Sequence, residues 1–303
     1  MLNAAVQIGQ VTVPTFAMAR GWLNRTWREA AVTGWVGAGR REGQSNALRY
    51  RSRVNVSTPP SSVPLGERQR FDRLDAVRAV AMLWMAAFHF AFDLNHFGVI
   101  RQNFYTDPLW TIQRICIVSL FLFCAGIGQA IAIDQHQSTA RFWRRWSRVA
   151  ACAALVSVGS TLMFPRSFIS FGVLHGIAVM LIVMRFSAGA GRWLWLLGAV
   201  AVLAPQFLHD PWFDTRWTNW IGLVTRKPVT EDYVPVLPWL GLMWWGLAAG
   251  QWLLAERRAW LTGTLPPVLR PLATLGRWSL SFYMLHQPAL IGLLALGVFI
   301  RGH

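Results

Sequence analysis

The feature that most constrains this chain is a series of apolar blocks, each about as long as a bilayer is thick. A bilayer core of about 30 Å needs roughly 20 helical residues to cross it. Because backbone polar groups must be bonded internally inside a bilayer, such blocks fold as helices. We expect seven transmembrane helices, at residues 77–97, 109–133, 148–164, 168–184, 193–208, 235–254 and 277–299.

Composition supports an all-α polytopic membrane helix bundle, with the lipid bilayer as its partner. Hydrophobic residues make up 54% of the chain and charged residues 14%, against about 25% charged in soluble domains. The net charge of +16 would fit nucleic-acid binding, but the cationic residues lie in short segments between apolar blocks, so we expect no nucleic acid.

The three cysteines fall inside apolar blocks, so we expect neither a disulfide framework nor a cysteine metal site. Nothing in the sequence indicates an oligomeric state.

The distribution of arginine and lysine predicts the orientation. Cytoplasmic loops of membrane proteins are enriched in these residues. They are concentrated before the first span and in the loops after the second, fourth and sixth. We therefore expect a cytoplasmic N-terminus in a bacterial inner membrane.

Residues 1–70 differ from the remainder of the chain. They are rich in arginine, and no block among them is apolar enough to span a bilayer. We interpret them as a disordered Arg-rich cytoplasmic extension, with an amphipathic segment on anionic lipid as the alternative. The transmembrane domain would then occupy residues 71–303.

Several ionisable residues interrupt the expected spans, and such residues are functional candidates because burying them in a bilayer is costly. His89 and Asp93 are one helical turn apart and share a face. Arg114 and His175 lie at a similar depth toward the outside. Together these four predict a polar pocket, in which Asp93 orients a histidine that serves as a base.

His286 is a fifth polar element and stands two residues before Pro288 in the last span. It is either a hydrogen-bonded histidine at a proline kink or a member of the site. The spacing of His89, Asp93 and His96 could hold a metal, and paired membrane histidines could ligate haem. We expect no metal.

The outer loop 209–234 carries tryptophans and carboxylates. The tryptophans fit an interfacial belt. The same residue types also suit carbohydrate binding, which gives this loop a second interpretation as an acceptor site.

Four segments in order resemble bacterial proteins grouped with the catalytic domain of heparan-α-glucosaminide N-acetyltransferase. Arg78 and His89, ten residues apart after Leu74-Asp75, resemble the first-helix signature of membrane-bound acyltransferases. The other segments are residues 171–175 (FGVLH), 232–241 (DYVPVLPWLG) and 281–288 (SFYMLHQP). The resemblance covers about residues 71–298. It departs from the lysosomal branch, where Asn stands at the place of His89, so amino-sugar N-acetylation is not carried over.

The resemblance implies transfer of an acyl group, typically acetyl, from cytoplasmic acyl-CoA to a sugar or amino sugar on the other side. His89 takes the catalytic position, and Arg78 with Arg73 would hold the CoA phosphates. The resembling segments assign Asp232, Tyr233 and His286 to the acceptor. Chemistry agrees, because attack on a thioester needs a base near neutral pKa and a group that stabilises the oxyanion; Arg114 or His175 could be that group.

Two other functional classes fit the same polar residues. A transporter or flippase would use them to move a sugar or lipid-linked substrate, and inverted repeats would favour it. A haem or quinone redox protein would use the histidines as ligands.

Overall fold

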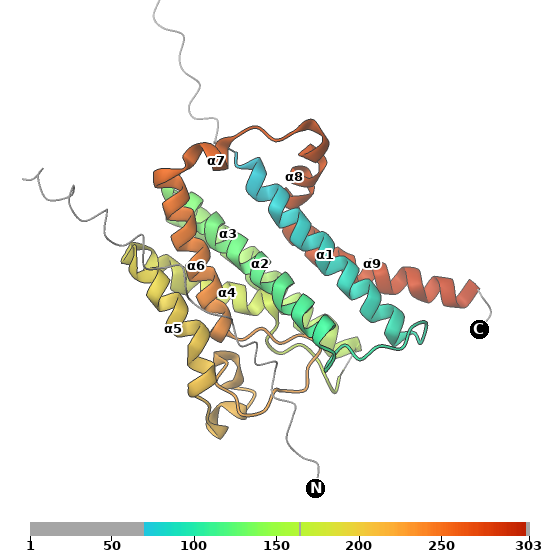
Figure 1. The fold of residues 1–303 in the computed structure, drawn as a ribbon. Coiled ribbons are helices and arrows are strands. Elements are labelled where there is room, and N and C mark those ends of the chain that lie inside the picture. The colour runs from blue at the N-terminus through green and yellow to red at the C-terminus, as the bar shows by residue number, and fades with distance from the viewer. Residues whose placement is uncertain (1–69, 164, 301–303) are drawn as a thin grey trace, which may run out of the picture. The chain divides into compact units, whose positions relative to one another are not determined.

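The computed structural model describes residues 70–163 and 165–300, which form helices joined by loops (Figure 1). Among these residues there is no strand, so the expected all-α fold is confirmed. The interpretation of residues 1–70 concerns a segment that lies, except for its last residue, outside the described residues. The long helices are α1 (Asp72–His96), α2 (Pro108–Asp134), α3 (Thr139–Met163), α4 (Val173–Ser187), α5 (Trp193–Phe207), α6 (Val236–Glu256) and α9 (Ser279–Ile300). Short helices and 3₁₀ turns connect them: η1 (Ala188–Ala190), η2 (Pro211–Asp214), η3 (Asn219–Ile221), α7 (Arg258–Thr262), η4 (Pro267–Leu269) and α8 (Arg270–Arg277).

A helix stands at each of the seven segments that the sequence predicts. Five of them, α1 to α4 and α9, are long and apolar enough to cross a membrane, with α4 extended to Ala190 by η1. The apolar helix α5 is shorter, at 15 residues. The chain is therefore a membrane helix bundle.

Three predicted helix starts are wrong, and the first is that of α1, which begins at Asp72 rather than at 77. α3 begins at Thr139 rather than at 148, so the arginines at 141, 144, 145 and 148 lie on a helix and not in a loop. α4 begins at Val173 rather than at 168. The backbone before it bonds to side chains instead: Ile169 donates to Ser160 Oγ at 3.0 Å, and its carbonyl accepts from Ser157 Oγ at 2.7 Å. Side-chain partners of this kind compete with helical hydrogen bonds.

Glycines bring the central helices α2 and α6 into close contact. Gly126 on α2 faces the carbonyl of Met243, and Gly246 on α6 faces the carbonyl of Phe123. A Cβ atom at either glycine would collide with the partner's backbone. Small residues at such positions let membrane helices pack closely.

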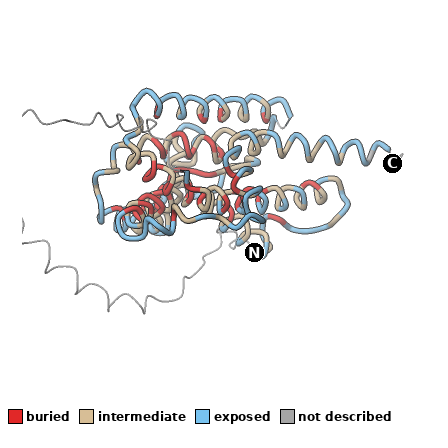
Figure 2. The backbone as a smooth tube through the Cα atoms, turned by 90° about the horizontal axis from the view of Figure 1, so that it is seen from above, coloured by how far each residue is buried: buried red, intermediate tan, exposed pale blue. Residues whose placement is uncertain are grey.

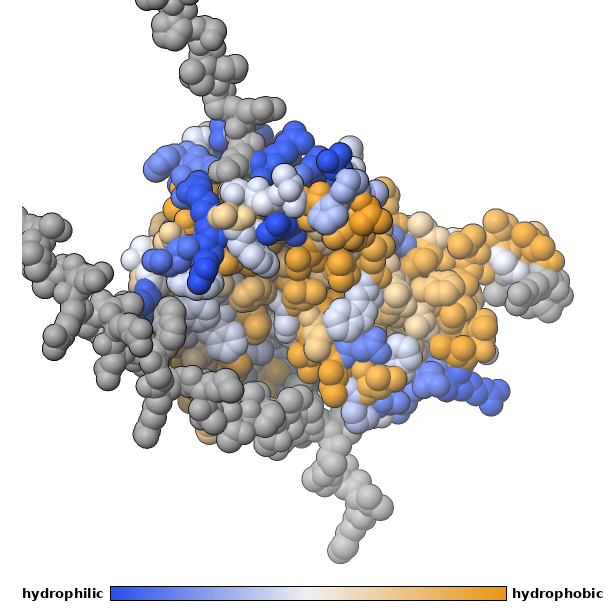
Figure 3. Space-filling model, turned by 45° about the horizontal axis from the view of Figure 1, so that its top comes forward, coloured by the Kyte–Doolittle hydropathy of each residue, from blue (hydrophilic) through white to orange (hydrophobic). Residues whose placement is uncertain are grey.

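The outward-facing sides of several helices carry large exposed apolar side chains. Buried residues gather between the helices (Figure 2). On α3, α5 and α9 these include Leu155, Leu162, Leu196, Leu293 and Phe299. Figure 3 shows apolar residues covering the flank of the molecule below a hydrophilic end. An exposed apolar surface of this kind is a liability in water and is satisfied by lipid.

The helix ends form two distinct groups (Figure 1). At one, which we call the α7–α8 end, Arg277 pairs with Asp72 at 2.8 Å and Arg258 with Asp134 at 2.9 Å. The other, the loop end, contains the connections after α1, α3 and α5. The ion pair of Arg277 lies just before α9 and ties the start of that helix to the start of α1.

Candidate active site

Two histidines from the first and last long helices meet directly. His89 Nδ1 on α1 lies 3.2 Å from His286 Nε2 on α9. The ring centroids are 5.1 Å apart, and the ring of Phe282 stacks parallel to His286. His89, expected to be the base, is thus joined to a histidine that the sequence assigns to the acceptor.

The backbone decides which nitrogen of His286 carries a proton. His286 Nδ1 faces the carbonyl oxygens of Tyr283 at 2.7 Å and Phe282 at 3.2 Å. Carbonyl oxygens only accept, so Nδ1 of His286 donates and Nε2 of its neutral ring has the lone pair. His89 Nδ1 is therefore the donor in the bond between the two rings.

One turn beyond His89, Asp93 is bonded to the residue that follows His286. Gln287 Nε2 donates to Asp93 Oδ1 at 2.9 Å, and Asp93 is 4% exposed. No hydrogen bond joins Asp93 to His89 among the described residues. Asp93 Oδ2 and Gln287 Oε1 are buried without a hydrogen-bond partner, so this pair still has an acceptor site open on each side chain.

His175 stands in a second polar group, at the start of α4. Its Nδ1 accepts from the backbone N–H of Gly172 at 3.2 Å, and its Nε2 bonds Ser157 Oγ at 3.0 Å. Because Ser157 itself donates to the carbonyl of Ile169, His175 Nε2 is the donor. Both ring nitrogens are thus occupied in holding the start of α4 against α3.

The carboxylate of Asp232 sits at the same helix start. Its Oδ2 accepts from the N–H of Val173 at 2.8 Å, an arrangement that the helix dipole favours. A side chain at Gly172 would collide with this carboxylate. Burial raises the pKa of Asp232, against the opposing effects of the Val173 N–H and of the charges on Lys227 and Arg114.

Arg114 and Tyr233, two further predicted site residues, belong to this second group. Arg114 on α2 interacts electrostatically with Asp232, and the hydroxyl of Tyr233 donates to the carbonyl of Asn219 at 2.7 Å. The charge of Asp232 also acts on Tyr283, whose carbonyl holds His286. The second polar group therefore lies within electrostatic range of the residue whose carbonyl holds His286.

The two arginines predicted to hold a donor lie at the α7–α8 end, and both have internal partners. Arg78 pairs with Asp75 at 2.7 Å, and Arg73 donates to the carbonyl of Trp260 at 2.8 Å. The second amino group of Arg78 lies against Gly128 of α2.

A cavity of about 200 Å³ opens beside Gly128, between the end of α2 and the start of α3. Arg141 and Arg145 line it, and neither has a carboxylate partner among residues 70–163 and 165–300. Unpaired guanidinium groups in a cavity suit an anionic group such as a phosphate.

The sequence predicts one pocket for these residues, but the structure divides them into two groups. His89, Asp93 and His286 meet between α1 and α9, whereas Arg114, His175 and Asp232 meet at the start of α4. Sequence reasoning missed Gln287 and Ser157. Gln287 lies within a segment that carries the resemblance, but Ser157 has no distinguishing sequence pattern.

The family model described as "Heparan-alpha-glucosaminide N-acetyltransferase, catalytic" matches residues 70–288. The chain belongs to this family. The match includes both polar groups and ends at Pro288, directly after His286 and Gln287. This is a family of membrane acetyltransferases, so the chain is a transferase of the acyltransferase type. No curated protein and no solved structure matches the chain.

Proposed function

We propose that this protein transfers an acyl group, acetyl in the simplest case, from cytoplasmic acyl-CoA to an extracytoplasmic sugar hydroxyl or amine. The protein would lie in a bacterial inner membrane with its N-terminus inside. The observation that carries the proposal is the bond of 3.2 Å between His89 and His286, inside a chain of this acetyltransferase family.

The tautomers favour His89 Nε2 as the basic atom. Tyr283 fixes His286 with its lone pair on Nε2, and His89 donates its Nδ1 proton there. The remaining nitrogen of His89 then takes the proton from the acceptor hydroxyl or amine as this attacks the thioester carbonyl. When the tetrahedral intermediate collapses, the C–S bond breaks and the proton passes from His89 to the CoA thiolate. An acyl-histidine route would use the same nitrogen as nucleophile.

Other predicted residues would support this step. The guanidinium of Arg114 would stabilise the oxyanion, since it is a cation close enough to interact with Asp232 on the acceptor side. Asp93 and His175 would act as positioning residues, because Asp93 is bonded to Gln287 and His175 to Ser157 and Gly172. Asp232 and Tyr233 would bind the acceptor from the loop end.

The donor would bind from the α7–α8 end. Arg78 and Arg73 are the predicted phosphate ligands, but their guanidinium groups already have partners. The cavity beside Gly128 adds Arg141 and Arg145, which are free to bind. CoA phosphates would fit there, while its thioester reaches along the bundle toward His89.

The test is acyl transfer or thioester hydrolysis by purified protein in detergent, with radiolabelled acetyl-CoA. The variant His89→Ala should lose transfer. His96→Ala removes an exposed histidine of the same helix and should keep it. Full activity in His89→Ala, or no acetyl-CoA binding by wild type, would contradict the proposal.

A further inference from the structure

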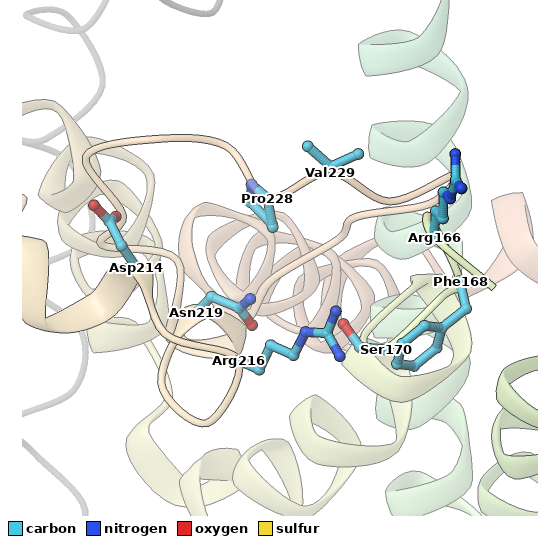
Figure 4. A pocket seen from close by; sticks show the side chains of 8 residues that line it. All are labelled: Arg166, Phe168, Ser170, Asp214, Arg216, Asn219, Pro228 and Val229. Atoms are coloured by element: carbon cyan, nitrogen blue, oxygen red, sulfur yellow. The ribbon is translucent and has the colours of Figure 1, made fainter. Parts of the chain in front are cut away.

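A separate cavity of about 250 Å³ lies at the loop end, between the α3–α4 connection and the segment 214–229. We call it the loop-end pocket. The proposed acyl-transfer step does not use this pocket. Its lining residues are Arg166, Phe168, Ser170, Asp214, Arg216, Asn219, Pro228 and Val229 (Figure 4).

Two arginines give the pocket a positive character. The guanidinium of Arg216 lies over the ring of Phe168, with its carbon 5.2 Å from the ring centroid, and Figure 4 shows it beside Ser170. Neither Arg216 nor Arg166 has a carboxylate partner among the residues that the structure describes. A guanidinium over an aromatic face keeps its N–H groups, which lie in its own plane, available for a ligand beside it.

The one carboxylate of the pocket lining is already bonded elsewhere. Asp214 Oδ1 accepts from the N–H groups of Thr225 at 2.7 Å and Arg226 at 3.2 Å, and Oδ2 accepts from the Thr225 hydroxyl. Figure 4 shows Asp214 at the side of the pocket opposite Arg166. Asp214 therefore forms no ion pair with Arg166 or Arg216.

A buried amide supplies a second, independent sign of a ligand. Asn219 is 3% exposed, yet its Oδ1 has no hydrogen-bond partner. A buried acceptor without a donor is costly, and a ligand hydroxyl would supply the donor. The Ser170 hydroxyl lies across the same pocket.

The pocket shares its two loops with Asp232. The hydroxyl of Thr230 donates to the carbonyls of Phe168 at 2.9 Å and Asp232 at 3.2 Å. Tyr233 donates to the carbonyl of Asn219. A molecule in the pocket would therefore lie next to the loop that the acceptor is expected to contact.

We propose that the loop-end pocket binds an acidic sugar. Arg166 and Arg216 hold its carboxylate or phosphate, and Asn219 Oδ1 accepts from one of its hydroxyls. The combination of cations with an orphaned acceptor selects a hydroxylated anion over a bare one. The inference rests on the proposed function only where it names this sugar as the acyl acceptor.

The experiment is calorimetric titration of the purified full chain in nanodiscs of neutral phosphatidylcholine, with no acyl donor present. Glucuronic acid and glucose 1-phosphate should bind, and glucose should bind at least tenfold more weakly. Arg216→Ala and Arg166→Ala should weaken binding of the acids by about 10- to 100-fold, as expected for losing a charge-assisted hydrogen bond. Arg101→Ala removes an exposed arginine of another loop at the same end and should leave binding unchanged.

Asn219→Asp provides a second variant with an isosteric side chain. Its added negative charge beside Arg216 should remove binding of both acids while glucose binding stays as weak as before. Equal binding of glucose and glucuronic acid, or equal affinities in wild type and Arg216→Ala, would overturn the proposal.

A second set of nanodiscs separates a sugar ligand from a lipid headgroup. Phosphatidylglycerol added to the discs should leave the affinity for glucuronic acid within about twofold; strong competition that disappears in Arg216→Ala would assign the pocket to lipid phosphate instead. Because no acyl donor is present, acid binding by a protein without transferase activity would sustain this inference and refute the proposed function. Acyl transfer by a protein that binds neither acid would support the proposed function and overturn this inference.

Discussion

His89 Nδ1 and His286 Nε2 lie 3.2 Å apart, although 197 residues separate them in the chain. The contact depends on α9 lying along α1, which the ion pair between Arg277 and Asp72 supports at the other end of the two helices. Because Tyr283 orients the second ring through its carbonyl, the last helix places an acceptor against Nδ1 of His89.

Replacement of His286 tests whether it positions His89. In His286→Ala the donor Nδ1–H of His89 loses its acceptor, so we expect kcat to fall by about 10²-fold or more, within the range of general-base effects. His286→Gln should recover part of the rate, because its amide oxygen can accept the same proton. The measurement is the initial rate of acetyl transfer at several pH values. Equal rates in the two variants would contradict a positioning role.

Removal of Gln287 tests the second contact between α1 and α9. Gln287→Leu leaves the buried Asp93 without its hydrogen-bond donor, which should lower the free energy of unfolding by about 1–3 kcal/mol. The measurement is unfolding in detergent followed by circular dichroism. Gln102→Leu alters an exposed loop residue and should change the free energy by less than about 0.5 kcal/mol.

Substitution of Gly126 tests the contact between α2 and α6. A Cβ atom there meets the backbone of Met243 and Leu247, which cannot rotate away as a side chain can. Gly126→Ala should therefore destabilise the protein by about 1–3 kcal/mol. Gly292→Ala is the matched control, because a Cβ atom at this glycine of α9 meets nothing within 4 Å. If the two variants melt at the same temperature, the close packing of α2 on α6 is not what stabilises the bundle.

The fold could be predicted from the sequence because bilayer thickness alone sets the length of an apolar helix. Each of the seven expected segments contains a helix. The errors arose where the apolar signal ends. The early start of α3 is charged and lies beyond the apolar block, and the late start of α4 depends on Ser157 and Ser160 bonding a segment far along the chain. No local pattern contains those contacts.

The candidate site was predicted residue by residue but not as a geometry. Depth along a helix places His89, Arg114 and His175 at one level, yet it says nothing about which helices are neighbours. α9 packs on α1, so His89 meets His286; α4 packs on α3, so His175 meets Ser157. The rotational position of each helix is set by packing against the others, which a single sequence does not encode locally.

Two carboxylates at the loop end should give opposite pH dependences of stability. Burial raises the pKa of Asp232 from its ordinary value of 3.8, so the folded state binds a proton more tightly than the unfolded state. Its contribution to stability is present below pH 3.8 and is lost as the pH rises through the raised pKa. The hydrogen bond from the Thr225 side chain is the largest effect that lowers the pKa of Asp214, so that carboxylate contributes above pH 3.8 and its contribution is lost at lower pH.

The corresponding variants separate these two effects. Asparagine does not titrate, so Asp232→Asn does not lose stability as wild type does when the Asp232 carboxyl loses its proton. The free energy of unfolding of the variant relative to wild type should therefore increase as the pH rises above about 4. Asp214→Asn should change in the opposite direction and become less stable relative to wild type as the pH rises toward 4. The measurement is chemical unfolding of both variants and wild type in one detergent between pH 3 and pH 7. Parallel curves for Asp232→Asn and wild type would mean that the Asp232 carboxyl titrates alike in the folded and unfolded states, contrary to its burial against the start of α4.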